Sequence, residues 1–106
     1  MNHLAISVEE LKVRLDRKDE FVILDVREPY EIALCNLGGT HIPLGQLPAR
    51  LAELDRNREI LVLCHHGSRS WRATLFLLES GFLNVKNITG GIDAWSEYVD
   101  PSVKRY

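Results

Sequence analysis

The sequence predicts an α/β domain with a mainly parallel central sheet and helices on both faces. Two short apolar runs, residues 21–24 and 60–63, are continuous, as is typical of strands that are covered on both sides. Segments with the apolar spacing of helices alternate with these runs, and that alternation favours a parallel sheet. With 106 residues and 45% apolar side chains, the chain suits one domain with a continuous core. We expect the core to span about residues 4–98 and a tail to span residues 99–106.

Capping and turn residues delimit the predicted elements. Ser7, with Glu10 three residues later, predicts a capping box at the start of the first helix. Pro29 and the pair Gly38-Gly39 break regular structure. In chain order we predict a helix beginning after Ser7, a strand over 21–24, a loop with one helical turn over 26–41, an amphipathic helix over 44–54, a strand over 60–63, a helix over 70–80, a strand over 84–88 and a helix over 92–98.

Composition limits the partners and the compartment. The formal net charge is -2, and the 13 basic and 15 acidic side chains are interspersed, so we expect neither nucleic acid nor an anionic membrane as a partner. Glu9, Glu10 and Lys12 interrupt any apolar stretch of a signal peptide, and no apolar run approaches the roughly 20 residues of a membrane helix. Without an export signal, Cys35 and Cys64 are expected to be reduced thiols in the cytoplasm.

Cys64 is the residue most suggestive of chemistry, because it follows a predicted buried strand and precedes a polar loop and a helix. The free amides and the dipole at a helix N-terminus stabilise a thiolate. Arg69 and Arg72 can add positive charge, and Gly67 allows the loop to turn its amides inward as an anion-binding nest. Asp25 ends the other apolar strand, so we expect it at the same sheet edge, where such folds bind ligands. A strand-terminal cysteine alone is more often a core residue, but the loop that follows favours a reactive one.

Four segments resemble the rhodanese-like domain family. The active-site loop of that family consists of a cysteine, four residues, an arginine and a small hydroxyl residue, and the matching residues here are Cys64, His65, His66, Gly67, Ser68, Arg69 and Ser70. Residues 24–31, which include Asp25 and Arg27, resemble the first signature of the family. Residues 40–44 resemble its histidine-isoleucine stretch, and residues 90–95 resemble its Gly-Gly-X-X-X-Trp motif. All four segments occur in the order of the family, so the resemblance covers most of the chain.

The resemblance implies a sulfurtransferase with one rhodanese domain over residues 1–106, in which Cys64 carries a sulfane sulfur as a persulfide. The thiolate would take sulfur from thiosulfate or a persulfide donor, and a thiol, cyanide or a protein would then accept it. The amides of residues 65–70 would cradle the persulfide, while Arg69 and Arg72 attract the anionic donor. Neither a metal nor an organic cofactor is needed. The tail resembles the end of rhodanese domains fused to adenylyltransferases, which implies a sulfur-carrier or desulfurase protein as partner.

Two other functions are consistent with the same loop. A cysteine-based phosphatase also holds an oxyanion above a cysteine at a helix N-terminus, but its loop has five residues between cysteine and arginine, whereas this loop has four. A non-enzymatic binding module, or a protein-partnered sulfur relay, is the second alternative. The presence of Cys64 argues against an inactive module.

The histidines could suggest a metal site, with His41 as a distant third ligand. We expect no metal, because adjacent histidines point in different directions and the spacing is not that of a zinc site. His65 and His66 are expected instead to line the pocket and to tune its charge near neutral pH.

Asp25, Arg27 and Glu31 are expected to form a paired, mainly structural cluster, since partly buried charges need partners. Cys35 is expected in a loop without basic neighbours, as a bystander or as a resolving thiol for Cys64.

Overall fold

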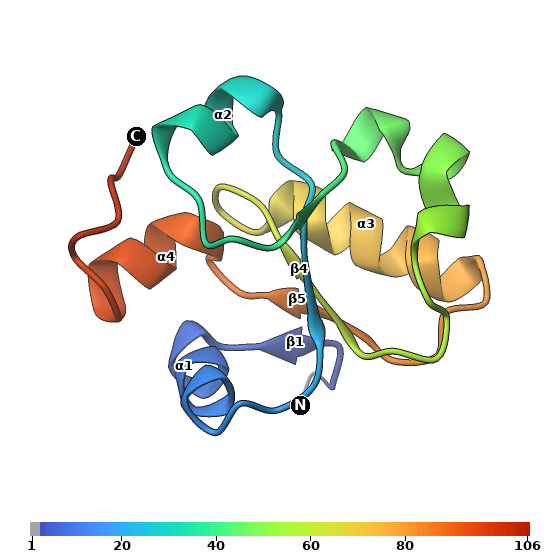
Figure 1. Cartoon of the computed structure of the whole chain (residues 1–106), viewed down its shortest axis with the longest axis horizontal. Coiled ribbons are helices and arrows are strands. Elements are labelled where there is room, and N and C mark those ends of the chain that lie inside the picture. The colour runs from blue at the N-terminus through green and yellow to red at the C-terminus, as the bar shows by residue number, and fades with distance from the viewer. Residues whose placement is uncertain (1–2) are drawn as a thin grey trace.

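A parallel sheet lies at the centre of the fold (Figure 1). The computed structural model describes residues 3–106, and within that range five strands pair in the order β1-β5-β4-β2-β3, all in parallel. The strands are β1 (Ala5–Ile6), β2 (Val22–Asp25), β3 (Thr40–His41), β4 (Ile60–Leu63) and β5 (Val85–Ile88). The α-helices are α1 (Val8–Asp16), α2 (Pro29–Leu34), α3 (Ser68–Glu79) and α4 (Gly91–Tyr98). The predicted α/β class is therefore confirmed.

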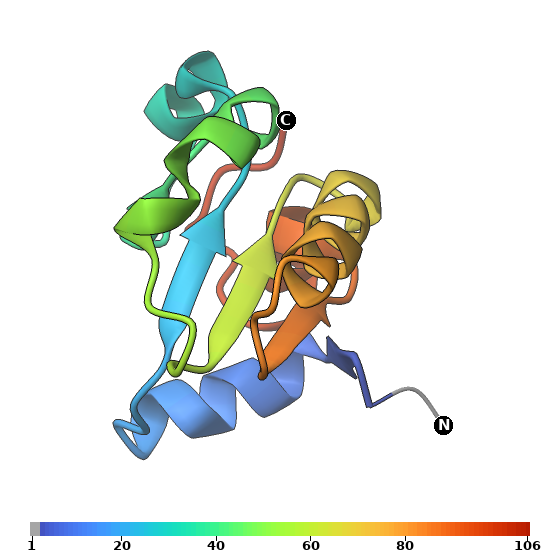
Figure 2. The same cartoon turned by 90° about the vertical axis from the view of Figure 1, so that its right-hand side faces the viewer.

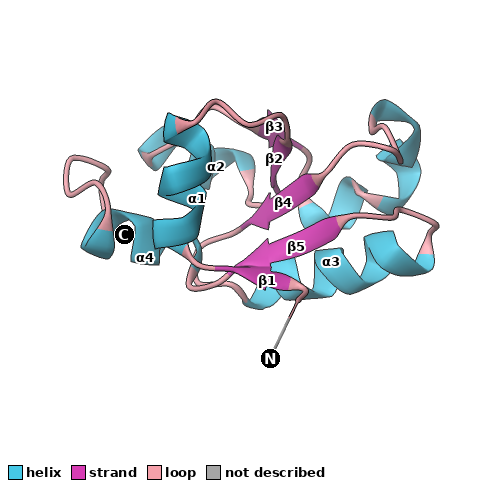
Figure 3. Ribbon diagram, turned by 90° about the horizontal axis from the view of Figure 1, so that it is seen from below, coloured by secondary structure: helices cyan, strands magenta, loops and turns pink. Residues whose placement is uncertain are grey.

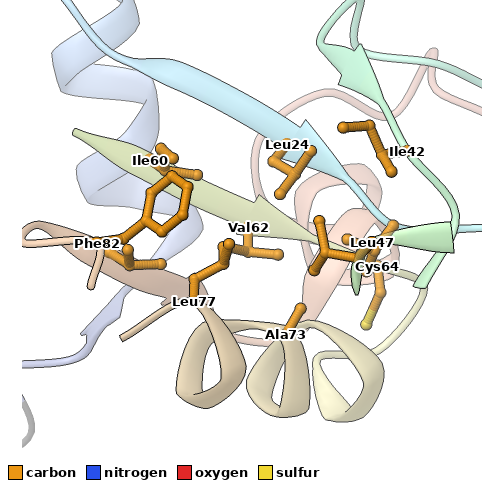
Figure 4. Close-up of a cluster of buried hydrophobic side chains, with 11 residues drawn as sticks. Leu24, Ile42, Leu47, Ile60, Val62, Cys64, Ala73, Leu77 and Phe82 are labelled. Carbon is orange, nitrogen blue, oxygen red and sulfur yellow. The ribbon is translucent and has the colours of Figure 1, made fainter. Parts of the chain in front are cut away.

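The central strand β4 is apolar throughout because both of its faces are covered. Ile60 and Val62 pack in a cluster with residues of α3, and Figure 4 shows this cluster beside the helix. Leu61 and Leu63 pack in a second cluster with residues of α1 and α4. Figure 3 shows α3 apart from α1 and α4, with the strands between them. Full burial of each aliphatic side chain contributes about 1.5–3 kcal/mol, so β4 anchors both halves of the core.

The predicted capping box at the start of α1 is confirmed. The Ser7 side chain accepts a hydrogen bond from the Glu10 amide at 3.0 Å, and the Glu10 carboxylate accepts one from the Ser7 amide at 3.0 Å. Both bonds satisfy amides that a helix N-terminus otherwise leaves unpaired. Within residues 3–106, no helix combines the length and the apolar character that a membrane span requires.

Three predicted segments differ from the structure. Residues 26–41 contain a six-residue helix, α2, in which Pro29 occupies the first turn, and a two-residue strand, β3. The helix predicted over 44–54 is wrong in type: Leu44–Gln46 and Pro48–Glu53 are 3-10 helices, and Arg50 leaves helical geometry with φ -119°. Pro48 has no amide to donate to the turn before it, which interrupts a continuous α-helix. The helix predicted from residue 70 begins two residues earlier, at Ser68.

The N-terminus of α4 packs directly on the chain that leaves β4. The amide of Ile92 donates to the Cys64 carbonyl at 2.9 Å, and the amide of Asp93 donates to the His65 carbonyl at 3.1 Å. Gly91 makes this approach sterically feasible: it has φ +62°, and a Cβ there would lie 2.4 Å from the Cys64 carbonyl oxygen and 2.5 Å from that of His65. The Gly-Gly pair therefore holds α4 against the cysteine loop.

Replacing Gly91 by alanine tests this packing. We expect Gly91→Ala to lower the free energy of unfolding by more than about 2 kcal/mol, because a left-handed conformation and a backbone clash add. Gly45→Ala is the matched control, since nothing lies within 4 Å of a Cβ at that position; it should change stability by less than about 0.5 kcal/mol. Urea unfolding of both variants measures the difference, and equal stabilities would contradict the close packing of α4.

Candidate active site

Cys64 lies at the carboxyl edge of the sheet, directly after β4. Asp25 ends the neighbouring strand β2, where it pairs with Leu63, so the two predicted site residues do meet at one edge. The Cys64 side chain is buried, with 1% of the residue exposed, and it points toward the first turns of α3 (Figure 4). Cys64 thus belongs both to the core and to the loop that follows β4.

The N-terminus of α3 is directed at the cysteine sulfur. Gly67 precedes the helix with φ +108°, a conformation that favours glycine, and its amide donates to Cys64 Sγ at 3.1 Å. Because α3 begins at Ser68, the predicted loop residues Ser68, Arg69 and Ser70 belong to its first turn. An amide donor and the positive end of a helix dipole together stabilise negative charge on a sulfur atom.

A polar network behind Cys64 fixes the side chain of Ser70. The amide nitrogen of Asn87 donates to the Gly67 carbonyl at 3.2 Å, which directs the Asn87 carbonyl oxygen toward the Ser70 hydroxyl. The Ser70 hydroxyl donates to that oxygen, and its own oxygen lies 3.2 Å from Cys64 Sγ, where either atom can be the donor. Sequence analysis missed Asn87, although a polar residue in a strand buried on both faces was the available signal.

Arg69 is bound by Glu31 rather than left free for an anion. Its two terminal nitrogens donate to the two carboxylate oxygens at 2.7 and 2.9 Å, and the Glu31 side chain is 3% exposed. The hydrogen bonds from Arg69 lower the pKa of Glu31 to about 2, and the same bonds raise the pKa of Arg69. Arg72, the other predicted source of charge, is exposed on α3.

The expected charged cluster of Asp25, Arg27 and Glu31 is present and buried. Arg27 donates to both carboxylate oxygens of Asp25, with distances of 2.9–3.1 Å, and to the backbone carbonyl of Glu31 at 3.2 Å. Arg27 also approaches Cys35, donating to its carbonyl at 2.8 Å and lying 3.7 Å from its sulfur. The expectation that Cys35 lacks basic neighbours is therefore wrong, because folding brings Arg27 to it from the loop that follows β2.

The tail packs against this cluster through Tyr106. Its hydroxyl donates to Glu31 at 2.7 Å and accepts from Arg27 at 2.9 Å, and its ring stacks on His65 with centroids 3.8 Å apart. Figure 1 and Figure 2 show the end of the chain returning from α4 to α2. Burial raises the pKa of Tyr106. Sequence analysis missed this residue because nothing near it in the sequence indicates its partners.

The two adjacent histidines lie side by side, contrary to the expectation that they point apart. The rings of His65 and His66 stack with centroids 3.8 Å apart and planes inclined by 30°. Burial, followed by the proximity of His66, lowers the pKa of His65, which favours its neutral form near neutral pH. His41 lies elsewhere, on β3, where its Nε2 contacts the Arg27 carbonyl at 2.6 Å.

Known proteins with similar sequences and folds belong to one family. A sequence profile of the rhodanese-like domain matches residues 7–98. The chain is 32% identical to a sulfurtransferase of Allochromatium vinosum over 92% of each chain. It is 35% identical to the adenylyltransferase and sulfurtransferase MOCS3 of Arabidopsis thaliana, over 95% of this chain and 25% of that protein. A rhodanese-like domain protein from Staphylococcus aureus superposes with a TM-score of 0.83 at 27% identity, over 96% of this chain and 97% of that chain. The chain spans between 23% and 50% of the longer curated relatives that it matches.

The ion pair of Glu31 predicts a defined loss of stability in acid. Because the pKa of Glu31 falls from 4.5 to about 2 in the folded chain, its carboxylate stabilises the fold above the unfolded value, and that contribution disappears as the pH falls from about 5 toward 2. Glu31→Gln should therefore lower the free energy of unfolding by roughly 3 kcal/mol at neutral pH and by progressively less below pH 5. Urea unfolding across this pH range measures the difference. Glu79→Gln, at an exposed position on α3, is the control; a penalty for Glu31→Gln that does not shrink in acid would contradict the assignment.

Tyr106→Phe removes the hydroxyl and keeps the stacked ring. We expect it to lower the free energy of unfolding by about 1–3 kcal/mol, since the buried charges of Glu31 and Arg27 each lose a hydrogen-bond partner. Tyr98→Phe is the matched control, because Tyr98 is 64% exposed. If the free energies of unfolding of both variants lie within about 0.5 kcal/mol of that of the unsubstituted protein, the Tyr106 hydroxyl does not stabilise the fold.

Proposed function

Because the chain belongs to the rhodanese-like domain family, we propose that it is a sulfurtransferase that carries sulfane sulfur as a persulfide on Cys64. The observation that carries the proposal is the contact between the Gly67 amide and Cys64 Sγ at the start of α3. It gives a single cysteine the hydrogen-bond donor and the helix dipole that a nucleophilic sulfur needs. The name of the Allochromatium vinosum relative, a sulfurtransferase of similar length, supports the same activity.

In the first step, the Cys64 thiolate attacks the outer sulfur of the donor. A bond forms between Cys64 Sγ and that sulfur, while the sulfur–sulfur bond of the donor breaks and its electron pair leaves with the remainder. The leaving group is sulfite when the donor is thiosulfate, and a thiolate when the donor is a persulfide. The Gly67 amide and the positive end of α3 stabilise negative charge at the sulfur throughout this step.

In the second step, an acceptor attacks the outer sulfur of the Cys64 persulfide. The acceptor is a thiolate, cyanide or a protein thiolate, and the Cys64 thiolate is the leaving group. The same donors that favour the thiolate before loading make it a better leaving group here. Donor and acceptor therefore use one site in turn, which predicts ping-pong kinetics.

The charges around the site affect how strongly an anionic sulfur donor is attracted. Asp25 compensates Arg27, and Glu31 compensates Arg69, so two of the cations near the cysteine are already paired. Attraction of an anionic donor then depends on the N-terminus of α3 and on the exposed Arg72, with Arg69 as a paired but 30% exposed contributor. This balance is compatible with thiosulfate and with a persulfide donor.

We place the reaction in the cytoplasm and in a protein sulfur relay. Cys35 and Cys64 are free thiols, which is compatible with a reducing compartment. A relative named adenylyltransferase and sulfurtransferase, which aligns with 95% of this chain, supports a partner that supplies or receives sulfur, such as a sulfur-carrier or desulfurase protein. The four residues between Cys64 and Arg69, one fewer than in cysteine-based phosphatases, make sulfur transfer the preferred activity over phosphate hydrolysis.

Sulfur loading of the intact protein tests the proposal. After incubation with thiosulfate, or with a small-molecule persulfide, we expect intact mass spectrometry to show a gain of one sulfur atom. Added cyanide should remove it as thiocyanate, because cyanide attacks the outer sulfur. Cys64→Ser should abolish the gain, whereas the matched Cys35→Ser variant should keep it. Loading from neither donor would overturn the proposal, and hydrolysis of an aryl phosphate by the same preparation would support the phosphatase alternative.

A further inference from the structure

The first turn of α4 brings a carboxylate to the two stacked histidines. One ligand atom each from His65, His66 and Asp93 lies within 4.8 Å of the others. We propose that these three side chains bind a borderline divalent transition-metal ion, with Zn²⁺ as the representative ion. The cysteine that carries the sulfur is not one of the three ligands, although His65 and His66 belong to the loop that follows it.

Backbone contacts and ring stacking together fix this arrangement. The Asp93 amide donates to the His65 carbonyl, which seats the first turn of α4 beside the loop that follows β4. The rings of His65 and His66 lie 3.8 Å apart and are splayed by 30°. Asp93 is therefore held next to the histidine pair before any ion arrives, and ligands that are already close lose less conformational freedom on binding.

The ligand chemistry selects the class of ion. Two imidazoles and one carboxylate are ligands that Zn²⁺ and its neighbours in the first transition series accept, with water in the remaining position, whereas Mg²⁺ and Ca²⁺ prefer oxygen ligands. His65 adds an independent observation: its Nε2 is shielded from solvent and has no hydrogen-bond partner within residues 3–106. Buried polar atoms without a partner are rare in folded proteins, and an ion is one of the partners that explain them.

Arg105 is the competitor of the ion for Asp93. Its Nε and one terminal nitrogen donate to the two carboxylate oxygens, each at 3.0 Å. The guanidinium is half-exposed, with 51% of its side chain accessible, and exposed ion pairs of this kind are weak. An ion that is coordinated by Asp93 would replace Arg105. The site therefore predicts that removal of Arg105 strengthens metal binding, a direction opposite to that of most damaging substitutions.

Isothermal titration calorimetry of the untagged protein tests the site. We expect one Zn²⁺ per chain and no binding of Mg²⁺ under the same conditions. His66→Ala and Asp93→Asn should each weaken Zn²⁺ binding at least about tenfold. Arg105→Ala should strengthen it roughly two- to fivefold. Lys104→Ala, the neighbouring exposed cation, is the matched control, and it should leave the affinity unchanged because Arg105 supplies the contacts to Asp93.

Two further variants separate this site from other ligands. Cys64→Ser should keep the affinity, since a thiol or persulfide is not part of the ligand set, and His41→Ala should keep it because His41 is bound to Arg27 on β3. Far-ultraviolet circular dichroism and thermal unfolding of each variant show whether it is folded. Absence of Zn²⁺ binding, binding that persists in Asp93→Asn, or binding lost in Cys64→Ser would overturn the proposal. Sulfur loading of Cys64 is measured separately, so either result leaves the sulfurtransferase test intact.

Discussion

The structure depends on the way in which the chain leaves its central strand. Cys64, which is buried, and His65, which is half-buried, come directly after β4, and their carbonyls lie beyond the strand pairing, where unpaired backbone groups are costly. The N-terminus of α4 needs hydrogen-bond acceptors instead, since its first amides have no carbonyl partners within the helix. The amides of Ile92 and Asp93 donate to the carbonyls of Cys64 and His65, so these amides and carbonyls are all paired. This contact requires glycine at position 91, and it brings α4 and the tail that follows to the cysteine loop.

A network of paired charges lies beside the loop that follows Cys64. Asp25, Arg27, Tyr106, Glu31 and Arg69 form one connected set of hydrogen bonds that runs from the end of β2 to the first turn of α3. Breaking such a set by removing one partner costs more than the set contributes, because a buried charge is left alone. The set therefore fixes the geometry of the loop. It also means that the main-chain amide of Gly67 and the dipole of α3, rather than an unpaired cation, provide most of the local stabilisation of the sulfur.

The sequence predicts those features that depend on local pattern. The continuous apolar runs identify β2 and β4, the capping box identifies the start of α1, and the position of Cys64 between a strand and a helix follows directly. Patterns fail where an element is too short to show a period, as in the two-residue strands β1 and β3, or where prolines replace an α-helix by 3-10 turns. They fail also where partners are distant in the chain. Glu31 meets Arg69, Tyr106 meets Glu31 and Asp93 meets His65 only through folding.

Burial of the cysteine sulfur gives the proposed transfer its direction. Cys64 is 1% exposed, whereas a persulfide would place its outer sulfur one bond further from the core. An acceptor that attacked Sγ itself would release hydrosulfide, whereas an acceptor that attacked the outer sulfur would receive that sulfur and release the Cys64 thiolate. Because Sγ is enclosed by the Gly67 amide, the Ser70 hydroxyl and the core, only the outer atom would be open to attack. The contacts that hold Cys64 in the core would thus favour transfer of sulfur over its loss.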